Sequence, residues 1–157
     1  MKGFCFFLNN EYFTVDVDLV QKVMRKINIT PVPSASDEVI GITNLKGRVV
    51  TILNLCVLLG SNKKNYVEYG HSTIKAVVLK TFSGNEDQLG LLIDKPGSLV
   101  EIDDKNIRSP SLPAGAKESF CICGIAEVDN MLYRIINVDS IINKYKYNGG
   151  NENVESV

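Results

Sequence analysis

The chain has 157 residues, of which 45% are hydrophobic and 22% charged, and its formal net charge is −1. A chain of this length buries roughly 70% of its unfolded surface, so it needs no metal or disulfide staple to fold. The nearly neutral charge gives no reason to expect binding to nucleic acid or to an anionic membrane.

Strand-forming runs separated by turn residues dominate the first half of the chain. The strands predicted there cover Phe4–Leu8, Tyr12–Val17, Ile42–Leu45 and Arg48–Leu53. Asn9-Asn10-Glu11 joins the first two as a hairpin. Lys46-Gly47 joins the last two, and Gly47 supplies the positive φ that a two-residue hairpin turn requires. Residues 34–38 follow two prolines and are predicted to form a loop.

The second half repeats this pattern after a polar segment, residues 61–72, that is predicted to be a connecting loop. Its strands are predicted over Ile74–Phe82, Leu89–Ile93, Phe120–Val128 and Met131–Ile136, with turns at residues 83–87 and at Asp129-Asn130. Asp139 is predicted to cap a short C-terminal helix that carries Ile141, Ile142 and Tyr145 on one side. The tail, residues 147–157, has little apolar content and is predicted to be disordered.

The two halves of the chain resemble each other in sequence. Residues 41–55 align without a gap with residues 124–138, and the alignment superimposes glycines, two isoleucines, an asparagine and both turns. Each half therefore carries a hairpin, an irregular linker, a second hairpin beginning Gly-Ile and a helical turn. This spacing favours a real duplication.

The repeat and the short strands predict an all-β fold of two small barrel lobes. Short strands leave exposed edges unless the sheet closes, so barrels are favoured over open sheets. We expect two SH3-like five-stranded β-barrel lobes packed together, with short helices and a C-terminal helix. The predicted domain covers residues 1–146, and its two intertwined lobes are expected to divide near residues 61–72.

Little in the sequence points to catalysis or to a metal. The single histidine, His71, lies in the polar loop without a base pattern around it, and no nucleotide-binding or nucleophile motif is present. The carboxylate pairs Asp16 with Asp18 and Asp103 with Asp104 are interpreted as turn and cap residues. Four cysteines, at positions 5, 56, 121 and 123, lie in apolar segments and are interpreted as buried thiols. We expect no enzyme activity, no cofactor and no metal site.

Membrane targeting is also not indicated. The apolar stretch Gly3–Leu8 is shorter than a signal-peptide core, and the longest apolar region, Val49–Leu59, is too short to span a bilayer. The protein is therefore expected to be cytoplasmic, without direct insertion into the membrane.

One segment carries a family resemblance. Gly41-Ile42-Thr43-Asn44-Leu45-Lys46-Gly47-Arg48-Val49-Val50 closely resembles the signature Gly-Val-x-Asn-Leu-Arg-Gly-x-Val-Val of the CheW-type coupling proteins. Tyr12–Val17 followed by Val20–Val23, Pro31-Val32-Pro33, Gly90–Asp94 and Gly124–Asp139 match further parts of that family in the right order. The resemblance covers roughly residues 3–145.

The resemblance implies a fold, a function and a set of partners. Members of that family fold as two SH3-like barrels, have no catalytic activity, and link chemoreceptors to a histidine kinase. It implies that the chain binds the regulatory domain of the kinase with one surface. It also implies a groove between the barrels that binds the helical cytoplasmic tip of a chemoreceptor. We expect the isolated protein to be a monomer, and the resemblance does not assign the kinase-binding residues.

The resemblance also implies which residues line the receptor-binding groove. By matching the motif, these are Val20, Lys22, Gly41, Asn44, Lys46, Gly47, Ile93 and Leu99. Each has a structural alternative, because the glycines can serve tight backbone and Val20, Ile93 and Leu99 can belong to the core. The family usually has Glu where Lys22 stands and Arg where Lys46 stands, so this chain replaces an acidic–basic pair with two like charges.

Three alternatives remain open at this point. The chain is an adaptor of another receptor–kinase system, such as one for surface motility or development, or a small-barrel module that binds RNA or a ligand, or an enzyme with an unrecognised site. A nucleic-acid module usually shows a basic stripe with exposed stacking aromatics. Here the aromatic residues lie largely within apolar strands, and no catalytic residues can be nominated.

Overall fold

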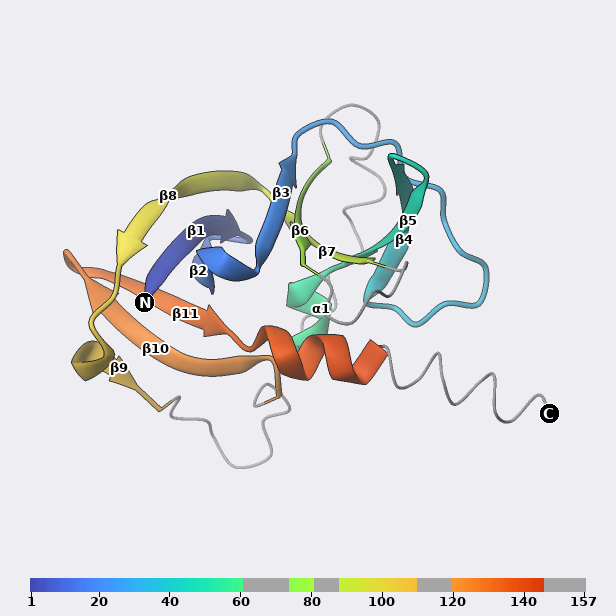
Figure 1. Ribbon diagram of the computed structural model, residues 1–157. Coiled ribbons are helices and arrows are strands. Elements are labelled where there is room, and N and C mark those ends of the chain that lie inside the picture. The colour runs from blue at the N-terminus through green and yellow to red at the C-terminus, as the bar shows by residue number, and fades with distance from the viewer. Residues whose placement is uncertain (61–73, 81–87, 110–119, 146–157) are drawn as a thin grey trace.

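The computed structural model describes residues 1–60, 74–80, 88–109 and 120–145, and these form two curved β-sheets (Figure 1). Sheet A contains β1 (Lys2–Leu8), β2 (Glu11–Asp16), β8 (Lys95–Glu101), β9 (Ile107–Arg108), β10 (Ile122–Val128) and β11 (Met131–Ile136). Sheet B contains β3 (Val20–Met24), β4 (Val39–Leu45), β5 (Arg48–Leu53), β6 (Lys75–Leu79) and β7 (Gln88–Ile93). The predicted all-β fold of two barrel lobes is confirmed.

Strand order shows how the two sheets correspond. Sheet A has the order β8-β1-β2-β11-β10-β9 and sheet B the order β3-β6-β7-β5-β4. Each sheet contains two antiparallel hairpins joined by one parallel pair, β2 with β11 in sheet A and β7 with β5 in sheet B. The two lobes, lobe A formed by sheet A and lobe B formed by sheet B, therefore have the same strand arrangement.

The sequence repeat is visible in the register of the second hairpin of each half. In β4–β5, Gly41 lies opposite Ile52 beside an irregularity in the register, and in β10–β11 Gly124 lies opposite Ile135 beside a matching one. These pairs superimpose in the sequence repeat. The two halves thus share register as well as sequence.

The two repeats exchange their first hairpins. The hairpin β1–β2 from the first repeat pairs with strands of the second repeat, and the hairpin β6–β7 from the second pairs with strands of the first. The lobe boundary expected at residues 61–72, which are outside the described residues, does not separate the lobes, because β5 before that segment pairs with β7 after it. The chain instead crosses between the sheets at the short helix η1 (Val17–Leu19) and at Asp94.

Hydrogen bonds hold the second crossing to the first hairpin. The backbone N–H of Asp94 donates to the carbonyl oxygen of Phe7 at 2.8 Å, and its carboxylate accepts from the N–H of Asn9 at 2.8 Å. Asn9 has a φ of 53°, in the left-handed turn between β1 and β2. One acidic residue therefore joins the crossing to a turn of the other repeat.

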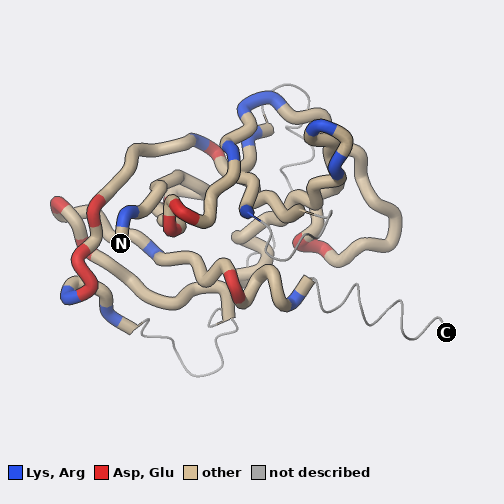
Figure 2. Tube along the Cα trace, viewed as in Figure 1, with Lys and Arg blue, Asp and Glu red and all other residues tan. Residues whose placement is uncertain are grey.

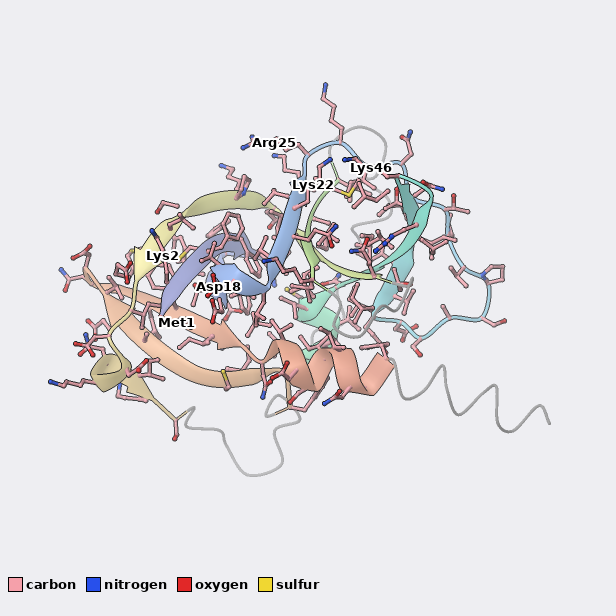
Figure 3. The ribbon with its side chains drawn as sticks, viewed as in Figure 1. Met1, Lys2, Asp18, Lys22, Arg25 and Lys46 are labelled. Carbon is pink, nitrogen blue, oxygen red and sulfur yellow. The ribbon has the colours of Figure 1, made fainter. Side chains whose placement is uncertain are left out.

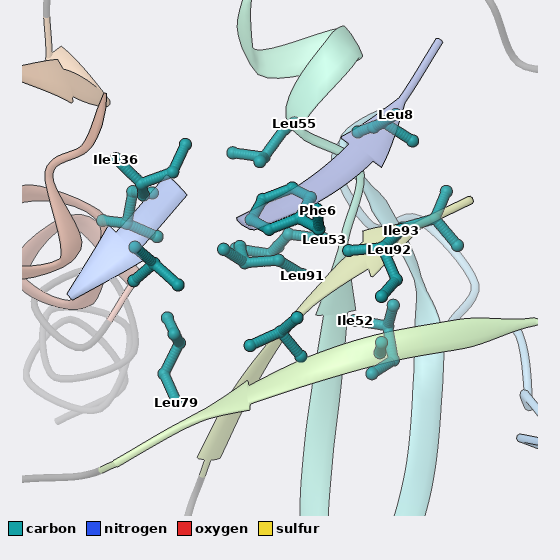
Figure 4. Close-up of a cluster of buried hydrophobic side chains, with 14 of the residues drawn as sticks. Phe6, Leu8, Ile52, Leu53, Leu55, Leu79, Leu91, Leu92, Ile93 and Ile136 are labelled. Atoms are coloured by element: carbon teal, nitrogen blue, oxygen red, sulfur yellow. The ribbon is translucent and has the colours of Figure 1, made fainter. Parts of the chain in front are cut away.

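The largest hydrophobic core lies between the two sheets. Sheet A contributes Phe6 and Leu8 of β1, Phe13 and Val15 of β2, Ile122 of β10 and Ile136 of β11. Sheet B contributes buried residues of all its strands except the edge strand β3. Figure 4 shows Phe6 beside Leu53 and Leu91, with Leu55 close by. A second, smaller cluster of Ile102, Ala126 and Ile135 fills part of lobe A. The two lobes are therefore not independent packing units.

Two edge strands of five or more residues were not predicted from the sequence, and neither was the two-residue edge strand β9. Val20–Val23 was matched to a part of the family but was not predicted to be a strand, yet Val20–Met24 forms β3 and pairs with β6. β8 was not anticipated because it carries Pro96 and Gly97, yet it pairs with β1. Proline is compatible with an edge strand because no partner needs its missing N–H. Both strands are edges, so their exposed faces lack the apolar alternation that marks a buried strand.

Asparagines cap the helices that end each repeat. Asn54 precedes α1 (Leu55–Leu58) and accepts from the N–H of Cys56 at 2.9 Å. Asn137 precedes the C-terminal helix, residues 138–145, and accepts from the N–H of Ser140 at 3.2 Å. The predicted cap, Asp139, is wrong. The cap is Asn137 and the helix begins at Val138, so Asp139 lies exposed in the first helical turn. The other predicted caps hold, since Asp16 and Asp103 begin η1 and η2 (Asp104–Asn106).

The C-terminal helix is fixed to lobe B through one polar contact. Ile141 is buried in the core that joins the lobes, and Ile142 and Tyr145 pack against it, as predicted. The hydroxyl of Tyr145 donates to Oε1 of Glu38 at 2.7 Å. Burial, and then the hydrogen bond to Glu38, raise the pKa of Tyr145 well above its usual value.

We predict that Gly41→Ala lowers the free energy of unfolding by about 1–3 kcal/mol, the usual cost of overpacking. A Cβ atom at position 41 would lie 2.4 Å from Cγ2 of Ile29 and 2.5 Å from the carbonyl oxygen of Thr30. Gly47→Asn is the control, because a Cβ atom there meets nothing within 4 Å and Asn tolerates its left-handed φ of +83°. Urea denaturation of both variants measures the difference. Equal losses would contradict the steric explanation.

We predict that part of the stability is lost above pH 10, where an unfolded tyrosine ionises. Because the pKa of Tyr145 is raised in the folded state, only the unfolded chain releases this proton as the pH rises, which favours unfolding. Tyr145→Phe should lower the free energy of unfolding by about 1 kcal/mol at neutral pH. The stability of this variant should decline less steeply than that of the wild type between pH 9 and 11. Denaturation midpoints of both proteins across that range test this. Parallel pH profiles would rule out a role for Tyr145.

Candidate protein-binding surface

The family signature forms the tip of the β4–β5 hairpin. Lys46 and Gly47 have φ values of 52° and 83°, and both values belong to the turn type that suits two-residue hairpins. The N–H of Gly47 donates to Oδ1 of Asn44 at 2.9 Å, which closes the turn. Val49, the second residue after the turn, is 43% exposed. The tip therefore presents a lysine and an apolar side chain from a fixed backbone.

Val20 and Lys22 lie on β3, which is an edge of sheet B. The strand pairs with β6 alone, in a register that shifts between Val20 and Lys22. Val20 is half-buried and Lys22 is exposed. Between them, the side chain of Gln21 accepts a hydrogen bond from the buried amide of Gln88. This contact fixes the strand that presents Lys22.

Leu99 lies on β8, the equivalent edge of sheet A. It is 51% exposed, so its side chain is available to a partner. In Figure 1 both edge strands, β3 and β8, lie along the upper side of the molecule. The strand order makes β8 and β3 counterparts, because β8 lies next to the hairpin β1–β2 and β3 lies next to the hairpin β6–β7.

Two of the residues that the resemblance placed in the groove face the interior. Ile93 is only 2% exposed and belongs to the core that joins the lobes. Gly41 is buried against residues 29 and 30, where its lack of a side chain lets two backbone segments approach. The structure thus leaves Val20, Lys22, Asn44, Lys46, Gly47 and Leu99 at the surface. Whether they bind a partner stays a prediction.

Cationic side chains gather around this surface. Figure 2 shows Lys and Arg concentrated over the upper part of lobe B, whereas Asp and Glu dominate the far end of lobe A. We call the exposed residues Lys22, Arg25, Lys26, Lys46 and Arg48 the basic rim. Figure 3 labels three of them, Lys22, Arg25 and Lys46, on that upper side. Sequence reasoning missed Arg25, Lys26 and Arg48 as members, because no motif links them.

A second surface feature, also missed from the sequence, is a row of aromatic rings across lobe A. Phe7, Tyr12 and Tyr133 lie on adjacent strands, with ring centroids 5.1 Å and 5.8 Å apart in edge-to-face contact. They line a hollow of about 310 Å³ together with Cys5 and residues 95–98 of β8. Its lining is aromatic and carries one cation, Lys95.

The cysteines form no disulfide, and three of them are buried. Cys123 is exposed, which differs from the predicted set of buried thiols. Cys121 precedes β10, and the register of that strand shifts next to Cys123, so the two side chains do not share one buried face. Burial raises the pKa of the Cys5 thiol, which keeps it protonated at neutral pH. Within the described ranges, no three His, Cys, Asp or Glu side chains are grouped to hold a metal ion.

Among the described residues, no helix is both long enough and apolar enough to cross a membrane. His71 and the tail, residues 147–157, lie outside the described residues.

The exchanged hairpins, the shared core and the equal plan of the two sheets define a double β-barrel protein built from a duplicated unit. The CheW-like domain family matches residues 2–146, so the chain belongs to that family. The resemblance identified from the signature segment is thereby confirmed.

Individual relatives agree with this assignment. The chemotaxis protein CheW of Thermotoga maritima is 26% identical over 139 residues, which cover 87% of this chain and 84% of that protein. The chemotaxis protein CheW of Rhizobium meliloti is 23% identical over 137 residues, covering 87% and 83%. The crystal structure of the scaffolding protein TtCheW from Thermoanaerobacter tengcongensis has a similar fold. Its TM-score is 0.69 at 23% identity, over 87% of this chain and 88% of that one.

We predict that Asn44 acts through the turn it closes. Asn44→Ala should lower the free energy of unfolding by about 0.5–1.5 kcal/mol, because the N–H of Gly47 loses its acceptor. Asn44→Asp keeps an acceptor at this position and should retain most of the stability. Thermal denaturation of both variants separates the two cases. If the aspartate variant is destabilised as much as the alanine variant, the hydrogen bond is not the cause.

Proposed function

We propose that this protein is a cytoplasmic, non-catalytic adaptor that couples chemoreceptors to a CheA-type histidine kinase. In this proposal it binds the helical cytoplasmic tip of a receptor and the regulatory domain of the kinase at the same time. It enters neither the membrane nor a complex with nucleic acid, needs no cofactor, and is a monomer in isolation. The observation that carries the proposal is the family match over residues 2–146.

The arrangement of exposed apolar side chains supports two separate binding surfaces. Leu99 on edge strand β8 is 51% exposed, and Leu132 on β11 is 52% exposed. Leu132 lies after the turn of the β10–β11 hairpin, at the position that Val49 occupies in the β4–β5 hairpin. A coupling protein needs two such surfaces, because occupation of one must leave the other free.

The receptor-binding part of the proposal uses the surface of lobe B and the edge of β8. Val20, Lys22, Asn44, Lys46, Gly47 and Leu99 supply its exposed side chains and backbone. Apolar side chains beside fixed polar ones suit the apolar stripe and polar flanks of an amphipathic helix. Gly41 and Ile93 support this surface from the interior.

A three-way reconstitution tests the proposal. The full-length protein is mixed with a receptor-tip fragment and with a kinase regulatory domain, and binding of each is measured alone and in the presence of the other. We predict that both bind one molecule together, each with a dissociation constant on the order of micromolar, equivalent to about 8 kcal/mol. Mutual exclusion, or binding of neither, would refute coupling. Binding only to fragments of a motility or developmental receptor system would place the adaptor in that pathway instead.

Two matched variants localise the receptor contact. Leu99→Glu should lower affinity for the receptor tip by about tenfold or more, since it places a charge where an apolar contact is expected. Leu132→Glu is the control, because it changes an equally exposed leucine on another strand. Loss of receptor binding in the Leu132 variant alone would move the contact to β11.

A further inference from the structure

The five cations of the basic rim have no acidic partner in the described part of the chain. The two ion pairs in that part, Arg108 with Glu127 and Arg134 with Glu11, both join strands of sheet A. Two lysines outside the rim have contacts of another kind: Lys75 donates to the carbonyl oxygen of Asp94, and Lys144 lies over the ring of Phe120. Among the described residues, the rim is therefore a set of cations without an ion-pair partner.

Strands and a closed turn present three of these charges, those of Lys22, Lys46 and Arg48. Lys46 occupies a left-handed position in a turn that Asn44 closes, and Arg48 is the first residue of β5, directly opposite Leu45. Lys22 lies within β3, opposite Val78 of β6. A partner that binds these side chains does not have to order the backbone that carries them, so less conformational entropy is lost on binding.

Apolar side chains accompany the charges. Val49 is 43% exposed and directly follows Arg48, and Val20 is half-buried two residues before Lys22. A surface that combines valines with lysines and arginines is complementary to a helix with an apolar stripe flanked by carboxylates. A uniformly acidic or uniformly apolar helix would leave one part of the surface unmatched.

The charged residues that the structure describes are unevenly distributed. Acidic residues gather at the opposite end, where Glu101, Asp103, Asp104, Glu127 and Asp129 border a hollow in lobe A. Figure 2 shows this acidic end well apart from the basic rim. The net charge of −1 therefore conceals a positive surface on lobe B, and this polarity favours one orientation of an approaching acidic partner.

We propose that the basic rim selects a receptor-tip helix that carries at least two acidic side chains beside its apolar stripe. This inference rests on the proposed function, and it adds the chemistry by which one receptor is distinguished from another. Lys22 and Lys46 are the central pair, because two like charges stand where the family resemblance places an acidic and a basic residue. A tip helix that offers a lysine or arginine to this position is repelled.

The test uses the full-length protein and two receptor-tip helical hairpins, one with its native acidic residues and one with these changed to the amides. We expect the acidic hairpin to bind at least tenfold more tightly at low salt. This preference should shrink as the salt concentration rises, because the Debye length falls to about 10 Å at 0.1 M. The double variant Lys22→Glu with Lys46→Glu should lose the preference and bind the amide hairpin at least as well as the acidic one.

A matched variant controls for net charge. Lys2→Glu with Lys105→Glu changes the charge by the same amount at exposed positions of lobe A, and it should keep the preference. Circular dichroism confirms that each variant is folded, and the milder pair Lys22→Gln with Lys46→Gln should show an intermediate loss. Full preference for the acidic hairpin in the glutamate double variant would overturn the inference.

The outcomes separate this inference from the proposed function. If the wild-type protein binds both hairpins equally and still binds the kinase domain, coupling stands and the inference fails. If it binds neither hairpin nor the kinase domain, the proposed function fails, and the inference fails with it. A third outcome is that neither hairpin binds, while a short RNA, anionic vesicles or a second copy of the chain bind the wild type and not the rim variant. That result would assign the rim to the ligand that binds and would also overturn the inference.

Discussion

Burial of the outer face of sheet A against sheet B is the interaction on which the rest of the structure depends. Phe6 and Leu8 of β1 and Phe13 and Val15 of β2 enter the core that joins the lobes, while Cys5 and Phe7 on the other face of β1 line the hollow with the row of rings. Each large side chain buried in this way contributes roughly 1.5–3 kcal/mol relative to exposure. Because the core is shared, neither lobe can turn relative to the other without exposing it, and the positions of all surface strands follow.

This rigidity explains why a surface spread over two lobes can act as one unit. The edge strands β3 and β8 belong to different sheets and are held in place by the same core and by the crossing at Asp94. Specificity on such a frame depends on exposed side chains, which can change without affecting the packing beneath them. The basic rim is an example, since Lys22, Lys46 and Arg48 lie on strands and a turn that are anchored to the core.

Much of this architecture could be predicted from the sequence, since it depends on local patterns. The Lys46-Gly47 and Asp129-Asn130 turns, the alternation of their flanking strands and the repeat itself all indicated hairpins. The edge strands escaped prediction because exposed edges lack that alternation, as Pro96 in β8 illustrates. The exchange of hairpins was equally hidden, because two halves with one pattern do not reveal which hairpin pairs with which. For the candidate site, spacing along a motif could not separate Lys22 at the surface from Ile93 in the core.

The parallel pairing of β2 with β11 places Thr14 beside Ile135, residues from opposite ends of the chain. During synthesis, therefore, the first hairpin leaves the ribosome long before the strand that completes its sheet exists. Contacts between such distant residues slow folding, because a long loop has to close before any of them forms. Until the last strands emerge, β1 and β2 keep an apolar face and an open edge exposed. An incomplete chain with this topology exposes a surface that chaperones bind. Its unpaired first hairpin can also pair with a neighbouring copy of the chain, which is domain swapping.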